Sequence, residues 1–167
     1  MAIRGLNHAV LYVRDAERSA DFYTDILGFR RLHTLPGAVF LLAPGSTNDH
    51  DLGLFGIGAA AFDSAAGNGA VGLYHLSWEV DTLGDLADHR DRLIRAGALA
   101  GASDHGTTKA LYAKDPDGLE FELSWIVPHR LLTGAEKMTT LPLDLDAEIA
   151  HYGADTRGRA RGDTVPS

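Results

Sequence analysis

The chain carries the same pattern of residues in each of its halves. Residues 6–29 (LNHAVLYVRDAERSADFYTDILGF) and 73–98 (LYHLSWEVDTLGDLADHRDRLIRAGA) both begin with Leu-x-His, continue as a strand-like run and then enter an amphipathic stretch. The histidine of this opening is His8 in the first copy and His75 in the second. An internal repeat predicts two copies of one structural unit, and this constrains the fold more than any other feature of the chain.

The amphipathic stretch of each copy predicts a helix. Asp15 is placed to cap the first helix, and either Asp81 or Thr82 to cap the second. Gly28 and Gly97 stand where the helices should end. Apolar residues at helical spacing predict one buried stripe on each helix. The stripes comprise Ala20, Phe22, Tyr23, Ile26 and Leu27 in the first copy and Leu83, Leu86, Leu93 and Ile94 in the second.

Three short strand-like runs follow each predicted helix. They are residues 29–35, 38–44 and 50–57 in the first half, and residues 98–105, 109–115 and 119–125 in the second. The predicted fold is therefore α+β, with two tandem βαβββ modules at about 4–56 and 71–126. A Gly/Ala-rich stretch, 56–70, connects the two modules.

The two modules together predict one domain over residues 1–127. Residues 128–167 lie outside the repeat and form a C-terminal extension. Within the extension, the stretch LPLDLDAEIAHYG (141–153) predicts one more helix. The final stretch, TRGRARGDTVPS (156–167), is typical of a flexible tail.

The charge balance and the cysteine count exclude several classes of partner and site. The chain has 15 Lys and Arg against 23 Asp and Glu, a net charge of −8, which disfavours nucleic acid and anionic membranes as partners. The absence of cysteine excludes disulfides, thiolate metal sites and a cysteine nucleophile. With no signal-peptide pattern and no apolar run that could span a bilayer, the sequence predicts a soluble cytoplasmic protein.

Polar side chains share one face of two predicted strands in the second module. Side chains alternate along a strand, so Glu122 faces away from the apolar positions that run from Leu119 to Trp125. His75 lies on the polar face of its own strand, and His8 holds the equivalent place in the first module. If both sheets curve around a common cleft, these three side chains form a 2-His-1-carboxylate facial triad for a divalent metal. Taken singly, each is also typical of a solvated strand face.

The turn DPDG predicts how the last two strands pair. If Asp115 pairs with Leu119, then Tyr112 falls opposite Glu122 and on the same face. Gly118 suits this turn because glycine adopts positive φ without a steric penalty. Tyr112 is then either part of the proposed site or a tyrosine of the core.

With these residues the sequence resembles the vicinal oxygen chelate superfamily, which includes glyoxalase I, bleomycin-resistance proteins and type I extradiol dioxygenases. The resemblance extends over about residues 4–126 and depends on LNHAVLYVRDAERSADFYTDILGF, LYHLSWEVDTLGDL and LYAKDPDGLEFEL. It implies paired βαβββ modules that form an open, cup-shaped mixed sheet with flanking helices around a metal centre.

Three features resemble small single-domain type I extradiol dioxygenases in particular. The stretch NDHDLGLF resembles a strand start of these enzymes and implies that His50 is an acid/base residue. Tyr112 precedes Glu122 by the spacing of the family's active-site tyrosine and metal-bound glutamate. His105 lies near the place of another substrate-contacting histidine. The resemblance therefore implies catalytic roles for His50, Tyr112 and His105.

The activity implied by the resemblance is extradiol ring cleavage, as in a catechol 2,3-dioxygenase. Fe(II), or alternatively Mn(II), would be held by His8, His75 and Glu122. A small catecholic aromatic and O2 would be the substrates. An exposed sheet edge and the additional C-terminal helix are compatible with a homodimer, and the sequence leaves the oligomeric state open.

Three other functions stay open from the sequence alone. A glyoxalase-like isomerase or lyase would use Zn(II) or Ni(II) and a fourth ligand, for which the strand HDLGLFGI offers only Asp51. A bleomycin-resistance-like protein would bind a small ligand without turnover, and a structural or regulatory role would leave the triad unused. The remaining histidines are expected at the surface or in packing; they are His33, His89, His129 and His151.

Overall fold

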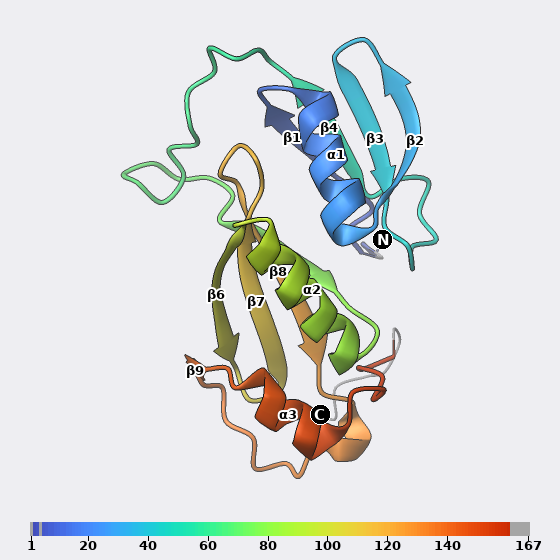
Figure 1. Cartoon of the computed structure of the whole chain (residues 1–167), viewed down its shortest axis with the longest axis vertical. Helices are drawn as coiled ribbons and strands as arrows, with labels where there is room; N and C mark the ends of the chain where they lie inside the picture. Colours follow the sequence, from blue (N-terminus) through green and yellow to red (C-terminus); the bar gives the residue numbers. More distant parts are fainter. Residues whose placement is uncertain (1, 4, 161–167) are drawn as a thin grey trace. The chain divides into compact units, whose positions relative to one another are not determined.

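The computed structural model describes residues 2–3 and 5–160, which form two compact units (Figure 1). The first unit comprises the described residues up to Ala65 together with the turn Asp115–Leu119. The second comprises Ala66–Lys114 and the described residues from Glu120 onward. Among the described residues, no helix has both the length and the apolar character that a bilayer crossing requires.

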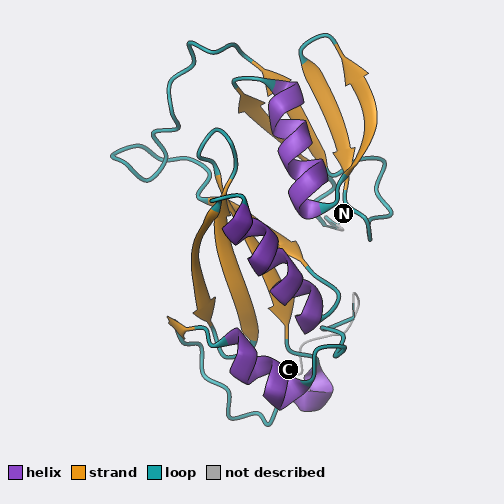
Figure 2. Cartoon of the chain, viewed as in Figure 1, coloured by secondary structure: helices purple, strands orange, loops and turns teal. Residues whose placement is uncertain are grey.

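Each unit contains one βαβββ module, so the predicted α+β class and element order are confirmed (Figure 2). The first module comprises β1 (Ala9–Val13), α1 (Ala16–Leu27), β2 (Arg30–Leu35), β3 (Ala38–Leu42) and β4 (Leu52–Gly56). The second comprises β5 (His75–Glu79), α2 (Leu83–Arg95), β6 (Leu99–Asp104), β7 (Thr108–Lys114) and β8 (Glu120–Ile126). The closing of the two sheets into one cup stays a prediction.

The two sheets share one topology, in which the first strand of the module lies beside its last strand. The strand orders are β1-β4-β3-β2 in the first unit and β5-β8-β7-β6 in the second, where β9 (Leu141–Pro142) adds a fifth strand. The pairs β1–β4 and β5–β8 are parallel and the others antiparallel, so each sheet is mixed. A parallel pair needs a long crossover, which the helix and the intervening strands supply. This topology places the histidine-bearing strand next to the strand that carries Glu122.

Both helices begin and end where the sequence predicts. The Asp15 carboxylate accepts hydrogen bonds from the backbone N–H groups of Glu17 and Arg18, which would otherwise lack partners in the first turn. Thr82, rather than Asp81, caps α2 and forms a reciprocal capping box with Asp85.

The apolar stripes of the helices supply much of the core of each unit, although Phe22 and Ile26 of the predicted stripe on α1 are only half-buried. On α1, Ala20, Tyr23 and Leu27 are buried against the sheet, as Leu83, Leu86 and Leu93 are on α2. The prediction for Ile94 is wrong, because this side chain is 55% exposed. It follows Leu93 by one residue, and a helix turns about 100° per residue, so it points away from the buried face.

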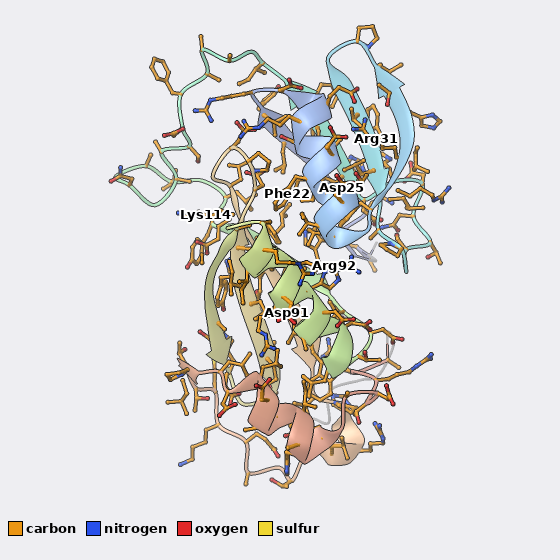
Figure 3. All side chains as sticks on the ribbon, in the orientation of Figure 1. Phe22, Asp25, Arg31, Asp91, Arg92 and Lys114 are labelled. Carbon is orange, nitrogen blue, oxygen red and sulfur yellow. The ribbon has the colours of Figure 1, made fainter. Side chains whose placement is uncertain are left out.

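Two partly exposed ion pairs join β2 to α1 in the first unit. Arg31 of β2 forms ion pairs with Glu17 and Asp21 of α1, and its position is labelled in Figure 3. These side chains are solvated, so the pairs add little to stability. They do orient β2 relative to α1.

The β7–β8 hairpin has the predicted register. The Asp115 N–H donates to the Leu119 carbonyl at 3.0 Å, and Tyr112 lies directly opposite Glu122. Gly118 has φ 81°, the left-handed conformation that the turn requires. The Asp115 carboxylate accepts the backbone N–H groups of Asp117 and Leu119, which stabilises the turn.

The described part of the C-terminal extension belongs to the second unit. The helix α3 (Leu145–Tyr152) lies within the stretch expected to be helical, and a 3-10 turn, η1, spans His129–Leu131. Near the chain end, the Trp125 indole N–H donates to the Thr156 carbonyl at 3.0 Å, and the Arg159 N–H donates to Ile126. Residues 161–167 of the expected tail lie outside the described residues.

Candidate metal centre and its surroundings

Two of the predicted metal ligands meet in the second unit. Nε2 of His75 lies 3.2 Å from Oε2 of Glu122, and the two side chains are 24% and 12% exposed. The parallel pairing of β5 with β8 brings them together. Ser77 lies opposite Glu122, and His75, two residues before Ser77 on β5, points to the same face of the sheet. Glu120 adds a second carboxylate, with Oε1 3.9 Å from His75 Nδ1.

The spacing of His75 and Glu122 fits two neighbouring ligands of one metal ion. Ligands bound at roughly 2.1 Å and at right angles around an ion are separated by about 3 Å. The observed nitrogen–oxygen distance is 3.2 Å. An imidazole nitrogen with a carboxylate oxygen is also a donor set that suits Fe(II), Mn(II) and Zn(II).

Tyr112 and His105 form a hydrogen-bonded pair in the same unit. The Tyr112 hydroxyl lies 2.8 Å from His105 Nε2, and the centroids of the Tyr112 and His75 rings are 5.9 Å apart. His105 Nδ1 lies 2.8 Å from the Thr139 carbonyl oxygen. Because a carbonyl can only accept, this contact favours the hydrogen on Nδ1, and in that neutral tautomer Nε2 accepts a hydrogen bond from the Tyr112 hydroxyl.

The surroundings of Tyr112 keep its phenol protonated. Burial raises the pKa of Tyr112 above 10.0, and the negative charge of Glu122 raises it further. Tyr74 and Glu120 act in the same direction. Tyr112 therefore stands beside the candidate ligands as a neutral hydrogen-bond donor at neutral pH.

The first unit brings together His8 and His50. Their ring centroids are 4.3 Å apart, with the planes tilted by 30°. Each histidine lies just before a strand. Because β1 and β4 pair in parallel with Ala9 opposite Leu52, the two rings meet at the end of the sheet where both strands begin. His8 Nδ1 lies 2.7 Å from the Asn7 side-chain oxygen, which leaves Nε2 with the free lone pair.

His50 is held by its neighbours on two sides. The Phe40 ring packs edge-on against it, with centroids 5.3 Å apart. The Asp49 carboxylate lies 3.3 Å from His50 Nδ1 and accepts the His50 backbone N–H at 3.0 Å. The backbone hydrogen bond from His50, and then the charge of its ring, lower the pKa of Asp49. The carboxylate is thus available to orient the imidazole.

Asp51 has a structural role in the loop before β4. It is 7% exposed and accepts hydrogen bonds from Ala43 N–H, the Ser46 hydroxyl and the Asn48 amide, at 2.7–2.8 Å. A carboxylate with these partners is occupied in holding the loop 43–51. Asp51 is the one acidic residue that the sequence places near a fourth-ligand position, and its hydrogen bonds disfavour that role.

The predicted triad stays a prediction, since His8 belongs to one unit and His75 and Glu122 to the other. Within each unit, the described residues contain no cluster of three or more His, Asp or Glu side chains that would hold a metal ion by itself.

The Thr139 carbonyl, which contacts His105, is the group at this site that the sequence did not predict. A backbone oxygen has no residue-type signature, so the sequence offered no signal for it. Of the remaining histidines, His33 and His151 are exposed and His89 and His129 half-buried.

Comparison with known proteins identifies relatives among dioxygenases. Catechol-2,3-dioxygenase of Bacillus subtilis (strain 168) is 28% identical over 164 residues, which are 96% of this chain and 56% of that protein. Biphenyl-2,3-diol 1,2-dioxygenase 2 of Rhodococcus globerulus is 32% identical over 117 residues, 70% of this chain and 60% of that protein. The chain therefore spans less than two thirds of the length of these curated relatives.

Solved structures share the fold. A glyoxylase/bleomycin resistance protein/dioxygenase domain from Frankia sp. EAN1pec has a TM-score of 0.60 at 25% identity, covering 74% of this chain and 92% of that domain. The fosfomycin resistance protein FosX of Listeria monocytogenes has a TM-score of 0.56 at 19% identity, covering 74% and 93%; a mutant of that protein has been solved with Mn(II). Lactoylglutathione lyase of Agrobacterium tumefaciens has a TM-score of 0.55 at 21% identity, covering 74% and 95%.

The match to a family profile agrees with both the fold and the repeat. It covers residues 5–123, which include the first βαβββ module and the second as far as the middle of β8, and it excludes the C-terminal extension. The chain belongs to the Glyoxalase/Bleomycin resistance protein/Dioxygenase superfamily.

Proposed function

We propose that the chain is a metal-dependent extradiol dioxygenase that opens the ring of a small catecholic aromatic with O2. One observation carries the proposal: His75 Nε2 and Glu122 Oε2 converge at 3.2 Å beside the Tyr112–His105 hydrogen bond. The two dioxygenase relatives, at 28% and 32% identity, support the type of reaction.

The proposed metal is Fe(II), or alternatively Mn(II), with His8, His75 and Glu122 as its ligands. When bound, it would polarise the two hydroxyl oxygens of a catechol and mediate electron transfer to O2. His8 suits the third position chemically, because Asn7 occupies its Nδ1 and leaves Nε2 free.

Tyr112 and His105 provide a route for the proton that a catechol hydroxyl must lose. The Tyr112 hydroxyl donates to His105 Nε2, so its oxygen lone pairs can accept a hydrogen bond from the substrate. When that substrate proton moves to Tyr112, the phenol proton can move to His105. The resulting imidazolium keeps the Thr139 carbonyl as the acceptor for its Nδ1–H.

His50 is proposed as a second acid/base group. An imidazole titrates near neutrality, so it can give a proton to an oxygen atom that gains negative charge during O–O cleavage. The Phe40 ring and the Asp49 carboxylate fix the orientation of His50 within the first unit.

Oxygen consumption by anaerobically purified, Fe(II)-reconstituted protein tests the proposal. A panel of catechols would be screened for O2 uptake together with the yellow ring-opened product. Glu122→Gln should abolish both, whereas Glu17→Gln, the same change on the exposed surface of α1, should abolish neither. Stoichiometric iron without uptake on any catechol would contradict the dioxygenase, and absence of bound iron would contradict the ligand set.

A glyoxalase-like isomerase or lyase is the second candidate, because a lactoylglutathione lyase shares the fold. It would be supported by Ni(II) or Zn(II) and would not need O2. The hydrogen bonds of Asp51 disfavour it, since they occupy the acidic side chain that the first module offers as a fourth ligand. Activity under strict anaerobiosis would favour this candidate over the dioxygenase.

A further inference from the structure

The C-terminal extension contacts the Tyr112–His105 pair through its backbone. The Thr139 carbonyl lies 2.8 Å from His105 Nδ1, and the Thr140 hydroxyl lies 3.5 Å from the same nitrogen. Both threonines lie outside the family match, which ends at residue 123. The C-terminal extension, which lies outside the repeat, thus contacts His105, a residue proposed to accept a proton during the reaction.

The segment 137–142 is closely seated on the turn between β6 and β7. The Thr139 hydroxyl donates to the Asp104 carbonyl at 3.3 Å, and β9 pairs with Ser103 and Asp104 of β6. Gly106 lies beneath the segment with φ +80°, and a Cβ at this position would meet the Lys137 carbonyl oxygen at 2.5 Å. The absence of a side chain at Gly106 is what allows the two backbones to approach so closely.

An ion cluster around the buried Lys109 ties the extension to the same sheet. Lys109 of β7, whose side chain is 4% exposed, pairs with Asp104 at 2.6 Å and with Glu148 of α3 at 3.1 Å. The Tyr152 ring, also on α3, lies 5.9 Å from the Lys109 ammonium. Burial opposes the charge, but the hydrogen bonds from Lys109 to Asp104 and Glu148 outweigh it and raise the pKa of Lys109. Removing one partner of such a cluster leaves a buried charge without its full compensation.

We propose that the extension is a positioning segment that selects the Nδ1–H tautomer of His105 through the Thr139 carbonyl. A neutral imidazole has one donor and one acceptor nitrogen. With the hydrogen on Nδ1, Nε2 accepts from Tyr112 and leaves the phenol lone pairs for a substrate hydroxyl. In the other tautomer Nε2–H would donate to Tyr112, reversing that hydrogen bond. The role in catalysis rests on the proposed function; the choice of tautomer does not.

Nitrogen NMR of histidine side chains in the metal-free, full-length protein tests this directly. The two ring nitrogens of a neutral histidine differ strongly in chemical shift, so the spectrum identifies the tautomer of His105. The wild-type protein should show Nδ1 protonated and Nε2 as the acceptor. A wild-type spectrum with Nε2 protonated would overturn the proposal.

Two variants weaken the positioning without altering His105 or Tyr112. Glu148→Gln removes one charge partner of Lys109, and Thr139→Val removes the hydroxyl bond to Asp104. Each should raise the Nε2–H population relative to Nδ1–H by roughly 2- to 10-fold, the range that corresponds to one net hydrogen bond. An unchanged tautomer ratio in both variants, with the amide spectrum still that of a folded protein, would overturn the proposal.

Matched controls separate positioning from general loosening. Asp146→Asn lies on the same helix as Glu148, but the Asp146 side chain is exposed and pairs with Arg90 instead of Lys109. Thr133→Val makes the same chemical change as Thr139→Val at a hydroxyl that bonds Glu136. Both controls should keep the wild-type tautomer ratio, and an equal shift in the controls would overturn the assignment to the Thr139 contact.

The same variants distinguish failure of this inference from failure of the proposed function. If catechol cleavage is found, Glu148→Gln and Thr139→Val should lower kcat more than they change KM for the catechol. If no catechol is cleaved but the tautomer shifts as expected, the proposed function fails and the positioning role stands. If catechol cleavage is found but the tautomer ratio of His105 is the same in all variants, the proposed function stands and the positioning role fails.

Discussion

Nε2 of His75 faces Oε2 of Glu122 at 3.2 Å across the parallel β5–β8 pair. The pairing follows from the βαβββ topology, which returns the last strand of the module to the side of the first. An imidazole and a carboxylate placed in this way by one sheet are spaced as two neighbouring ligands of one metal ion would be.

Loss of a proposed metal ligand should release the metal. Because removal of a group that merely supports a ligand costs about 10–100-fold in metal affinity, His75→Ala or Glu122→Gln should cost more than roughly 100-fold. Iron per chain after equilibrium dialysis measures this. His33→Ala, at an exposed position on β2, should keep the iron content of the wild type. Full iron occupancy in Glu122→Gln would contradict the ligand assignment.

His50→Ala should lower the rate and leave the metal bound. Removing one positioned acid/base group typically costs about 10²–10⁴-fold in rate. Steady-state O2 uptake and iron content would be measured on the same samples, so that the two effects are separated. If iron is lost together with activity, His50 is a ligand or a support for one, and the proposed role is wrong.

Asp51→Asn should destabilise the first unit without changing the metal content. The buried carboxylate accepts three hydrogen bonds, and an amide can accept at only one of its two positions. Because hydrogen bonds to a charged group contribute about 1.5–3 kcal/mol, we expect the free energy of unfolding to fall by about 2–3 kcal/mol. Urea denaturation measures the loss, with Asp25→Asn on the exposed face of α1 as the control. Loss of metal in Asp51→Asn would instead support the isomerase-type ligand set.

Asp115 should make the free energy of unfolding fall as pH rises. Burial raises the pKa of Asp115 above 3.8, although the backbone N–H groups of Leu119 and Asp117 oppose the shift. The folded state thus holds this proton more tightly than the unfolded state, so the contribution of Asp115 is full below about 3.8 and is lost as pH rises through the raised pKa.

Asp115→Asn keeps an oxygen for the turn and removes the titration. The difference in unfolding free energy between wild type and Asp115→Asn should therefore shift against the wild type between pH 3.8 and neutrality. Urea denaturation at several pH values measures this difference. Parallel stability curves for the two proteins would show that Asp115 titrates normally.

The hydrogen bonds that Glu136 accepts within residues 133–136 should persist until strongly acidic pH. The Glu136 carboxylate accepts the Thr133 N–H, the Thr133 hydroxyl and the Gly134 N–H. The Thr133 backbone hydrogen bond is the main cause that lowers the pKa of Glu136 from 4.5 to about 2. Since the folded pKa is depressed, the contacts persist as pH falls below 4.5 and are lost through about pH 2. The Thr133 and Gly134 amide shifts report the midpoint, and a midpoint near 4.5 would contradict the assignment.

Much of the fold could be predicted because it depends on local sequence. The N-cap at Asp15, the helix end at Gly28 and the register of Tyr112 opposite Glu122 are each decided within a few residues along the chain. Periodicity likewise predicted which faces of α1 and β8 are buried. The error at Ile94 arose because an apolar residue next to the stripe was counted as part of it, although its direction on the helix decides its burial.

The sequence by itself determined the two modules, the strand faces and the residue types at the candidate site, since these follow from helical and strand periodicity. Only the tertiary structure decided which partners these side chains have. It set the 3.2 Å distance between His75 Nε2 and Glu122 Oε2, occupied Asp51 with hydrogen bonds from its own loop, and brought the Thr139 carbonyl to His105. Residue types suggested the first of these contacts, but strand pairing fixes its distance. The last depends on a backbone oxygen, which every residue carries alike, so no pattern of residue types predicts it.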